Sequence, residues 1–573
     1  MPKLAISGLG KVGLMYDADP ADMPINAVTD ALNVRFAGRE VEQGLGSQYE
    51  PYYTWMIEGM AEVCPMYLAQ PIIYDGFSDG ARLVFFLGES WEPGAMAIYS
   101  QNMSIPDFTG LTTIPDWPSS SRWSAYKGQI NNCPFFGAQG FQPYGKQYDW
   151  EGVSTLPGWG EQTGGDQIVV TRRWSCKKLI SFGNRLIMMN TSEESSGGVD
   201  LPYPTRLRWS GFTQQNAFPI NWDDTALNRT PEEAAAAVID GYAGWMDLAS
   251  DTQLIDACNN GGTLFVYSER ETFSVTPSGN ANSPFVTKQV YSDCGVLDLG
   301  CVVNAKGYNY VFTGSDFVRH DSVRWESVAE GVCRDWLNEV VSTPRPGAVR
   351  LVNYPELNEI WVMTKGDDQE ADDCAKTQCL TFNYITNTWS RKSLPYINEA
   401  VFAPIAPDSS VAGSTWDSMP GAWDDAGQEW GGAGLHIAQG TMIGLCAAGG
   451  VYYLNTGDVE YRHVYSAGAW SMQSQPLQCF IERRGLDLGD GVRSLVTRTE
   501  MSGTGSGRIE LAMAGAETEG AGYSWDKQGI ESLATQRRLT WLVDGNIHGY
   551  RLGFNGFGSI PSKLTIYFED NGE

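Results

Sequence analysis

Three glycines near the start of the chain have the spacing of a dinucleotide-binding loop. Gly8, Gly10 and Gly13 occupy the positions of a G-x-G-x-x-G motif shortly after a stretch that can form a strand. In a dinucleotide site the third glycine opens a helix whose backbone amides hold the pyrophosphate. Here Pro20 and Pro24 interrupt the required helix. We therefore interpret the glycines as turns in an extended N-terminal segment, where positive φ angles suit glycine.

The aspartates that follow these glycines have the residue type, but not the pattern, of a calcium loop. Asp17, Asp19 and Asp22 lack both the glycine at position six and the glutamate at position twelve that an EF-hand needs. A polar turn is the simpler interpretation. A second glycine cluster, "GTGSG" at 503–507, stands between two strand-like runs and is predicted to be a hairpin loop instead of a phosphate cradle.

The residues that usually mark an enzyme do not form a recognisable set. The four histidines, His320, His436, His463 and His548, are not at metal-ligand spacing. Neither the serine elbow G-x-S-x-G, the zinc motif H-E-x-x-H nor the P-loop occurs. Among 68 acidic residues a glycosidase carboxylate pair is not excluded, but no sialidase-type repeat marks the hairpins. We expect no enzyme activity and no cofactor, and assign no catalytic, cofactor-binding or metal-ligating residue.

A tryptophan-rich stretch is the best candidate for binding a ligand. Trp416, Trp423 and Trp430 are spaced at intervals of seven residues, as in a coiled-coil helix. Pro420 and nearby glycines, however, rule out a helix here. We interpret the stretch as a loop whose indole rings pack on a neighbouring surface. Carbohydrate stacking beside aspartates is the functional alternative. A propeller-type protein that binds or cleaves glycans is therefore one alternative for the whole chain, and a kelch-like adaptor built from repeats is another.

Charge and cysteine content narrow the class of protein. The chain has 573 residues and a formal net charge of −29, which argues against a protein that grips nucleic acid through a basic surface. The acidic run at 366–373 is predicted to be a solvated loop. Eleven cysteines without C-x-x-C pairs suggest reduced thiols made in a cytosol. No secretory signal or membrane-spanning apolar run is evident, so we expect no membrane insertion.

The elements expected to position these residues are short strands joined by tight turns. A turn containing glycine or asparagine followed by alternating apolar and polar residues recurs along the chain, which is typical of β-hairpins. The repeated segments are 182–193, 259–277, 305–322, 357–367 and 447–458. A similar segment, 380–395, predicts a strand, a turn at Thr386 and Asn387, and a returning strand that contains Trp389.

The spacing of these strands predicts a β-propeller. Strands near Ile187, Leu264, Tyr310, Ile360 and Tyr452 are separated by 77, 46, 50 and 92 residues. The two middle values match one propeller blade of about 40 to 50 residues. We expect the last value to correspond to two blades and the first to contain an insertion. Radially packed blades also account for 20 tryptophans, because large aromatic rings fill the space between sheets.

Few segments predict helices. The first, 230–241, begins with Thr230 as N-cap, has Pro231 at its first position and stops at Gly241. The second, 328–341, places Trp336 and Leu337 on one apolar face. Both are interpreted as insertions between blades. The expected organisation is an extended arm (1–50), a poorly defined β-rich insertion or first blades (51–165), propeller blades with short helices (166–480) and a C-terminal β-sandwich-like region (481–573).

Taken in order, these segments resemble one family, the tail hub or nozzle proteins of short-tailed bacteriophages, also called tail tubular protein B or packaged-DNA stabilisation proteins. The N-terminal segment 17–46 resembles their arm and includes an "NVRF" strand. The later segments that resemble the family in order are "TRLRWSG" (205–211), "VTKQVYSDCGVLDLGCVV" (286–303), "YNYVFTGSDFVRHDS" (308–322), "SVAEGVCRDWLNEVV" (327–341), "NEIWVMT" (358–364), "FNYITNTWS" (382–390), the tryptophan loop (416–430) and "GLDLGD" (485–490).

The resemblance implies a structural role in the virion tail. It suggests six copies in a ring below the portal and adaptor, in contact with tail fibre or spike and needle proteins. Such a ring would be assembled in the host cytoplasm, close the channel on packaged double-stranded DNA and pass the genome during ejection. An acidic wall is suited to this task, since a basic lumen would hold DNA through its phosphates. Residues 51–165 resemble no segment of the family.

Overall fold

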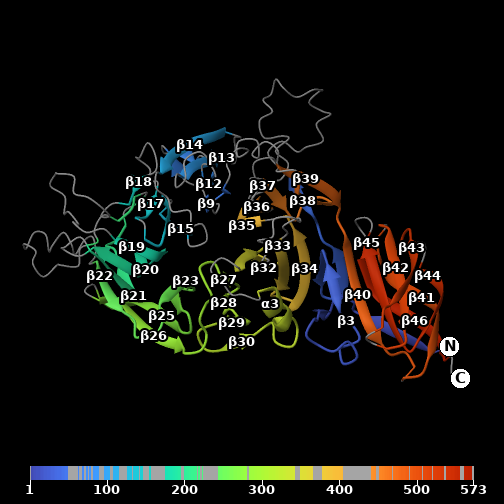
Figure 1. Cartoon of the computed structure of the whole chain (residues 1–573). Coiled ribbons are helices and arrows are strands. Elements are labelled where there is room, and N and C mark those ends of the chain that lie inside the picture. The colour runs from blue at the N-terminus through green and yellow to red at the C-terminus, as the bar shows by residue number, and fades with distance from the viewer. Residues whose placement is uncertain are drawn as a thin grey trace, which may run out of the picture.

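The fold, seen in a computed structural model, is built almost entirely from β-strands (Figure 1). The structure describes residues 2–49, 243–280, 283–341, 349–365, 377–395, 397–403, 441–446, 451–466, 469–489, 491–505, 507–518, 521–534, 537–554 and 560–570, with shorter segments between 62 and 222. The predicted helix at 230–241, the acidic run at 366–373 and the tryptophan loop at 416–430 lie outside these residues.

Seven antiparallel sheets follow one another along the chain. The first contains β8 (Glu62–Val63), β9 (Tyr67–Ala69), β12 (Arg82–Gly88), β13 (Met96–Asn102) and β14 (Asp107–Ile114), beside a pair formed by β10 (Ile73–Tyr74) and β11 (Phe77–Ser78). The second contains β15 (Ala125–Ile130), β16 (Cys133–Ala138), β17 (Tyr144–Gly145) and β18 (Ser154–Thr155). The third contains β19 (Trp174–Phe182), β20 (Arg185–Glu194), β21 (Asp200–Trp209) and β22 (Gly244–Asp247).

The next three sheets have the same up-and-down order. They are β23 (Leu254–Asn260), β24 (Thr263–Ser268), β25 (Thr272–Asn280) and β26 (Ser283–Tyr291); β27 (Val302–Ala305), β28 (Tyr308–Phe312), β29 (Phe317–His320) and β30 (Trp325–Ser327); and β31 (Val349–Tyr354), β32 (Glu359–Lys365), β33 (Thr377–Asn383) and β34 (Thr388–Leu394). The seventh combines β35 (Ile397–Ala403), β36 (Thr441–Cys446) and β37 (Val451–Leu454) with an N-terminal strand, β7 (Ser47–Tyr49).

These sheets are arranged as propeller blades. The first strands of successive sheets lie next to one another, from β15 through β19, β23, β27 and β31 to β35, and β9 lies next to both β35 and β15. Figure 1 shows the sheets following one another around this inner set. The predicted all-β propeller fold with insertions is therefore confirmed.

The predicted hairpin turns are found where asparagine or glycine adopts a positive φ angle. Asn184, Asn358 and Asn387 have φ values of 59°, 56° and 54°, and Gly262 has 86°. Each lies between two paired strands, so the turn residues locally determine where the chain reverses. For the segment 447–458 only strand β37 and the residues after it are described, because 447–450 lie outside the described residues.

Aromatic side chains fill the space between neighbouring sheets. Phe285 of β26 lies 5.8 Å from Phe182 and 5.5 Å from Trp209, both of the preceding sheet, measured between ring centroids. Tyr354 of β31 likewise lies 5.3 Å from Phe402 of the next sheet. Large buried side chains stabilise such contacts by about 1.5 to 3 kcal/mol each. Aromatic rings thus fill the space between sheets in these places, as the sequence predicted.

One prediction from strand spacing is wrong. The 92 residues between Ile360 and Tyr452 were expected to contain two blades, but they connect the second strand of one sheet to the third strand of the next. The interval is long because residues 404–440 separate β35 from β36, which pair directly with each other. Spacing alone cannot distinguish an extra blade from a long connection between paired strands.

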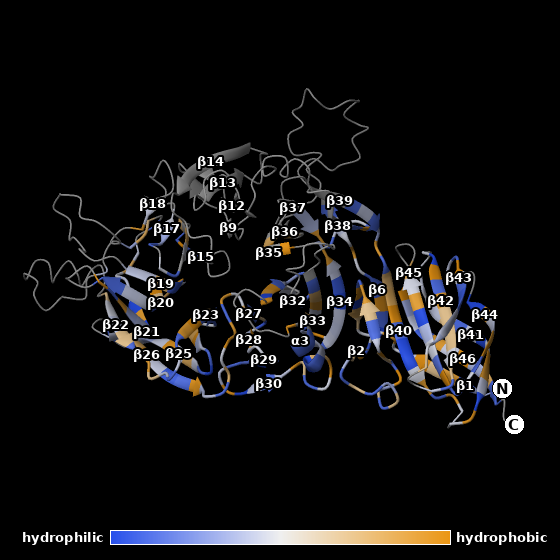
Figure 2. Cartoon of the chain, in the orientation of Figure 1, coloured by the Kyte–Doolittle hydropathy of each residue, from blue (hydrophilic) through white to orange (hydrophobic). Residues whose placement is uncertain are grey.

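The C-terminal strands form a sandwich together with strands from the N-terminus (Figure 1). One sheet has the order β1 (Lys3–Ser7), β46 (Ile560–Asp570), β41 (Ser494–Thr504) and β44 (Arg538–Gly545). The other has the order β4 (Asp30–Leu32), β40 (Cys479–Leu486), β45 (Ile547–Phe554), β42 (Ile509–Ala516) and β43 (Ser524–Ile530). Strand β44 shows regular alternation of exposed and buried residues. Figure 2 shows hydrophilic and hydrophobic residues mixed along the strands of the sandwich. A pair, β38 (Val459–Ser466) with β39 (Ala469–Pro476), precedes the sandwich.

The glycine cluster at 503–507 does not form the hairpin loop that the sequence predicted. Strands β41 and β42 on either side of it belong to different sheets of the sandwich and do not pair with each other. The loop therefore crosses between the two layers. Local turn signals predict that a chain changes direction, but not which strand it will pair with afterwards.

The N-terminal arm joins the propeller to the sandwich. Besides β1, β4 and β7 it contributes β2 (Gly13–Leu14), β3 (Ala27–Val28) and a hairpin of β5 (Val34–Ala37) and β6 (Glu40–Gln43). Strand β4 pairs with β40 of the sandwich on one side and, in parallel, with β34 of the sixth blade on the other. A nine-stranded sheet consequently runs from β31 to β43.

The one helix in the described residues is shorter than the sequence predicted. Helix α3 spans Arg334–Val340 instead of 328–341. Gly331 has a φ angle of 68°, which is incompatible with a right-handed helix, so the regular turn begins only after it. Leu337 is buried, as expected, and Trp336 packs at the edge of the core. Among the described helical residues nothing is long and apolar enough to cross a membrane.

Candidate functional site

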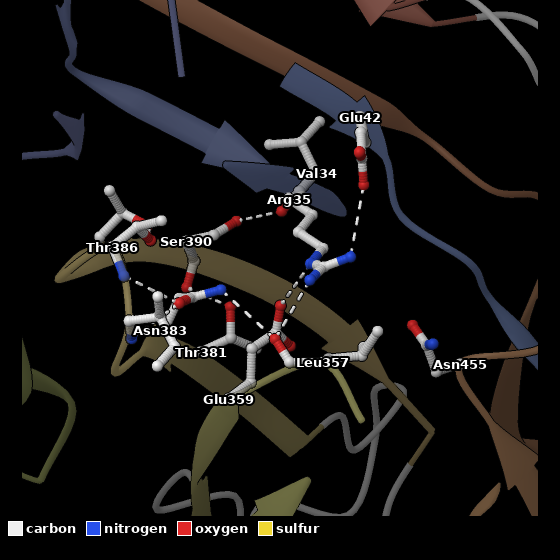
Figure 3. Close-up of polar contacts among 12 residues, drawn as sticks. Val34, Arg35, Glu42, Leu357, Glu359, Thr381, Asn383, Thr386, Ser390 and Asn455 are labelled. Carbon is white, nitrogen blue, oxygen red and sulfur yellow. Dashed lines mark hydrogen bonds and ion pairs between the residues drawn. The ribbon is translucent and has the colours of Figure 1, made fainter. Parts of the chain in front are cut away.

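A polar cavity lies between the β5–β6 hairpin of the arm and the β31–β34 sheet of the propeller. Its volume is about 150 Å³. The side chains that matter most for its chemistry are Arg35 and Glu42 from the hairpin, Glu359 and Lys392 from the sheet, and Asn455 from the end of the seventh blade. Figure 3 shows how the hairpin and the sheet bring most of these groups together.

Arg35 links the hairpin to the sheet. Its guanidinium lies 3.4 Å from the Glu42 carboxylate on the neighbouring strand β6 and 3.5 Å from the Glu359 carboxylate on β32. It also donates a hydrogen bond to the Leu357 carbonyl at 3.2 Å. The three contacts use the planar fork of the guanidinium, so one side chain holds two chain segments 322 residues apart.

Glu359 is the buried carboxylate of this cluster, and only 6% of the residue is exposed. Burial raises the pKa of its carboxyl, while the charge of Lys392 opposes that rise. The indole N–H of Trp361 donates a hydrogen bond to Glu359 at 3.1 Å and also favours the ionised form. Removing these partners would leave a buried charge unpaired, which is costly.

Lys392 brings a buried amine to the same cavity. Its Nζ donates a hydrogen bond to Asn455 Oδ1 at 2.5 Å and lies 4.8 Å from the centroid of the Trp361 ring. Burial lowers the pKa of Lys392 to about 8, and the nearby Glu359 carboxylate limits the fall. A part of the amine is therefore deprotonated near neutral pH, which is unusual for lysine.

The strands that carry these groups are fixed by side-chain hydrogen bonds. Asn383 accepts hydrogen bonds from the backbone amides of Ile385 and Thr386, which closes the turn between β33 and β34. Ser390 then donates to the Val34 carbonyl at 2.6 Å and attaches β34 to the hairpin. Figure 3 shows both contacts on the side of the cluster opposite Asn455.

Chemically, the cavity can accept a small polar molecule and exchange a proton with it through Lys392 or Glu359. The same contacts also attach the arm to the propeller. Sequence reasoning assigned no residue of this cluster. Lys392 shares a strand face with Thr388 and Ser390, so neither alternation nor motif spacing marks it, and Arg35 stands in a distant segment. Only knowledge of the pairing between arm and blade would have identified the site.

The histidines that the sequence singled out as possible chemistry are core residues where their side chains are described. His320 and His548 are fully buried. His320 Nε2 lies 2.8 Å from the Tyr267 hydroxyl, and His548 Nε2 lies 2.9 Å from the Ser494 hydroxyl. Burial lowers the pKa of His320 to about 4, so its ring is neutral at physiological pH. His463 belongs to β38, and His436 lies outside the described residues.

The glycine and aspartate motifs of the arm have structural roles. Gly8 and Gly13 have φ angles of 69° and 83°, as predicted for turns. Gly10 is required for close approach, since a Cβ there would lie 1.9 Å from the Glu40 carbonyl oxygen. Asp17 accepts hydrogen bonds from two amides at the start of α3, and Asp19 accepts one from Ala21 within its own turn. In the described part of the chain, no group of three or more histidine, cysteine, aspartate or glutamate side chains is placed to hold a metal ion.

Comparisons with known proteins find similarity only among solved structures. No protein-family model matches the chain, and no curated protein matches it. The structure of YCF48 bound to a D1 peptide is 10% identical with a TM-score of 0.31, covering 74% of this chain and 97% of the other. AztD from Citrobacter koseri is 10% identical with a TM-score of 0.28, covering 57% and 85% respectively.

An enzyme structure is also among the similar folds. The exo-β-1,3-galactanase of Phanerochaete chrysosporium, solved with galactose, is 9% identical with a TM-score of 0.19 and covers 78% of this chain and 95% of its own. At such identities and scores, similarity carries no argument about function. The function must therefore be argued from the residues and the geometry of this chain.

Proposed function

We propose that the chain is a structural virion protein that forms the hub or nozzle ring in the tail of a short-tailed bacteriophage. In this role, six copies extend and close the DNA channel below the portal and adaptor, retain the packaged genome and pass it during ejection. The proposal rests on the order of the family-like segments along the sequence. Fibre or spike and needle proteins are the expected neighbours at its other contacts.

The observation that best supports this role is the way the arm joins propeller and sandwich. Arm strands take part in both sheets of the sandwich and in the seventh blade, and β4 completes a nine-stranded sheet between the two parts. Such an arrangement makes one stiff unit out of two folds. A wall subunit that surrounds DNA under pressure needs this stiffness more than it needs a ligand-binding cleft.

The negative net charge of the chain suits a channel that does not bind the DNA passing through it. A formal charge of −29 on each subunit repels the phosphates of duplex DNA, which carry one charge per ~1.7 Å of axis. Screening limits this repulsion to about 8 Å at physiological salt, so it acts only on DNA that is already inside the ring. An acidic lumen would thus favour sliding over retention by charge.

The genetic test is the assembly of particles without this chain. We expect such particles to package DNA and then lose it, so that nuclease-sensitive DNA accumulates while capsid yield stays unchanged. Adding the purified chain before packaging ends should restore retention. Normal infectivity without the chain would refute the proposal, and hydrolysis of aryl glycosides by the purified protein would favour the glycan-active alternative.

A further inference from the structure

A short segment of the arm connects helix α3 to the sandwich. We call residues 16–23 the strap. At one end, the backbone amides of Tyr16 and Asp17 donate hydrogen bonds to the Val332 carbonyl at 2.6 and 3.1 Å. The Tyr16 ring stacks on Trp336 of α3, with centroids 5.6 Å apart and planes inclined by 10°.

The strap also supplies the cap that helix α3 lacks locally. The N-cap residue Cys333 makes no side-chain cap hydrogen bond. Asp17 accepts hydrogen bonds from the amides of Asp335 at 3.0 Å and Trp336 at 3.4 Å. Its carboxylate thus satisfies two amides at the helix start from a position 318 residues away in the sequence.

At its other end the strap is held by Arg483 of β40. The guanidinium donates hydrogen bonds to the Pro20 carbonyl at 2.7 Å and the Met23 carbonyl at 3.3 Å, and it contacts the Met23 sulfur at 2.6 Å. Arg483 is only 2% exposed. The strap therefore supplies three polar contacts to a buried cation.

The contacts between the strap and Arg483 compensate only poorly for the burial of the guanidinium charge. Among the hydrogen-bond partners that the described residues provide to Arg483 there is no carboxylate, and its Nε has no partner. A buried cation without an anionic partner carries a desolvation cost that carbonyl groups offset only in part. Exposing the guanidinium to water by lifting the strap recovers that cost, whereas lifting a paired β-strand recovers nothing comparable.

We propose that the strap is a releasable latch, which detaches from α3 and Arg483 while the sheets on both sides stay folded. The pairing of β4 with β34 and with β40 stays in place on release, because neither pairing involves a residue of the strap. The inference concerns motion within one chain and is independent of the proposed tail function. If hydrogen exchange refutes the latch, the proposal of a tail ring still stands. If the ring proposal is refuted, the latch still stands.

Hydrogen exchange of the full-length chain, followed by mass spectrometry, tests the latch. In the unmodified protein, peptides covering the strap should exchange on the order of tenfold faster or more than the peptide covering β45, because they open locally. Asp17→Ala should speed exchange of both the strap and α3 peptides about fivefold, the equivalent of losing one typical helix cap. Exchange of β40 and β45 should not change.

The matched control is Asp22→Ala, which removes the same charge from an exposed position of the strap. It should leave exchange of α3 at the wild-type rate. Two results would overturn the latch: exchange of the strap at the rate of β45 in the unmodified chain, or equal acceleration of every peptide by Asp17→Ala. The second result would mean that the strap opens only when the whole fold does.

Discussion

Two strands with the same place in their blades have opposite environments. Both β26 and β34 are the fourth strand of their sheets. Strand β26 has many exposed positions, including Val286 at 55% exposure. This is expected for an outer propeller strand that faces water. Strand β34 has five buried and two half-buried residues and no exposed one. The difference arises because the arm covers β34 and leaves β26 open, so position in a blade does not determine burial.

Covering β34 requires that its polar groups be satisfied by the arm and the next blade. The amide of Ser393 donates a hydrogen bond to the Asn33 side chain at 2.8 Å, and Ser390 donates to the Val34 carbonyl. Lys392 finds its acceptor in Asn455. A strand of polar composition can thus be buried when a second segment supplies matching donors and acceptors.

The largest expected effect separates a covered strand from an uncovered one. Trp389 of β34 is 1% exposed and lies 4.8 Å from Phe382. Trp389→Ala should lower the free energy of unfolding by about 3 to 5 kcal/mol. Trp325→Ala, on the outer strand β30 where the side chain is 37% exposed, should cost about 1 kcal/mol. Urea unfolding measures both, and equal losses would contradict the comparison.

The next prediction concerns the ion pair between arm and blade. Arg35→Met should lower the free energy of unfolding by about 2 to 3 kcal/mol, because Glu359 then stays buried with one partner fewer. Adding Glu359→Gln to Arg35→Met should recover part of that loss. A double-mutant cycle with no coupling would show that hairpin attachment does not depend on this pair.

A third effect, smaller per pH unit, should appear in the pH dependence of the free energy of unfolding. The pKa of Lys392 is lowered by burial to about 8, against an ordinary value of 10.5. Between these values the unfolded chain binds more protons than the folded one, so this lysine makes stability rise with pH, by up to about 1.4 kcal/mol per unit. The gain should be complete above pH 10.5 and absent below pH 8.

The measurement is the difference in unfolding free energy between the wild type and Lys392→Met, because thiols and phenols that ionise in the same range contribute equally to both proteins. From pH 8 to 10.5 the free energy of unfolding of the wild type should rise relative to that of the variant. A difference that stays constant over that range would mean that the lysine is charged in the folded state.

The smallest expected effect is at an uncovered edge. Arg206 of β21 lies between the rings of Tyr203 and Trp245, 3.6 and 3.8 Å from their centroids, and pairs with Asp247 at 2.8 Å. Trp245 is 44% exposed. Trp245→Leu should therefore lower the free energy of unfolding by only about 0.5 to 1 kcal/mol, measured by urea unfolding. A loss as large as that of Trp389→Ala would mean that edge and covered strands are equivalent.

Local patterns in the sequence predicted the fold class but not its long-range pairing. Alternation and Asn or Gly turns identified hairpins such as β33–β34, since both signals act within a few residues. The pairing of β7 with β37 joins segments some 400 residues apart and leaves no local trace. The same limit explains why the 92-residue interval was interpreted as two blades and why the loop at 503–507 was expected to form a hairpin.

The candidate site was beyond sequence reasoning for a related reason. Arg35, Glu359 and Lys392 lie on three strands that meet only after the arm has folded onto the sixth blade. Asp17 was considered for calcium because of its aspartate neighbours, although its role is to cap a helix far along the chain. The residue types indicated polar interactions both in the cavity and at Asp17. The role of each residue, however, depends on the partner that it contacts in the folded chain.

Electron microscopy of the purified, assembled chain tests the central proposal most directly. If the protein is a wall subunit of a tail channel, end views should show closed rings with six-fold symmetry around an open lumen, with the propeller and sandwich of each subunit resolved as one stiff body. A population of single discs, each the width of one propeller and without rotational symmetry between copies, would contradict it.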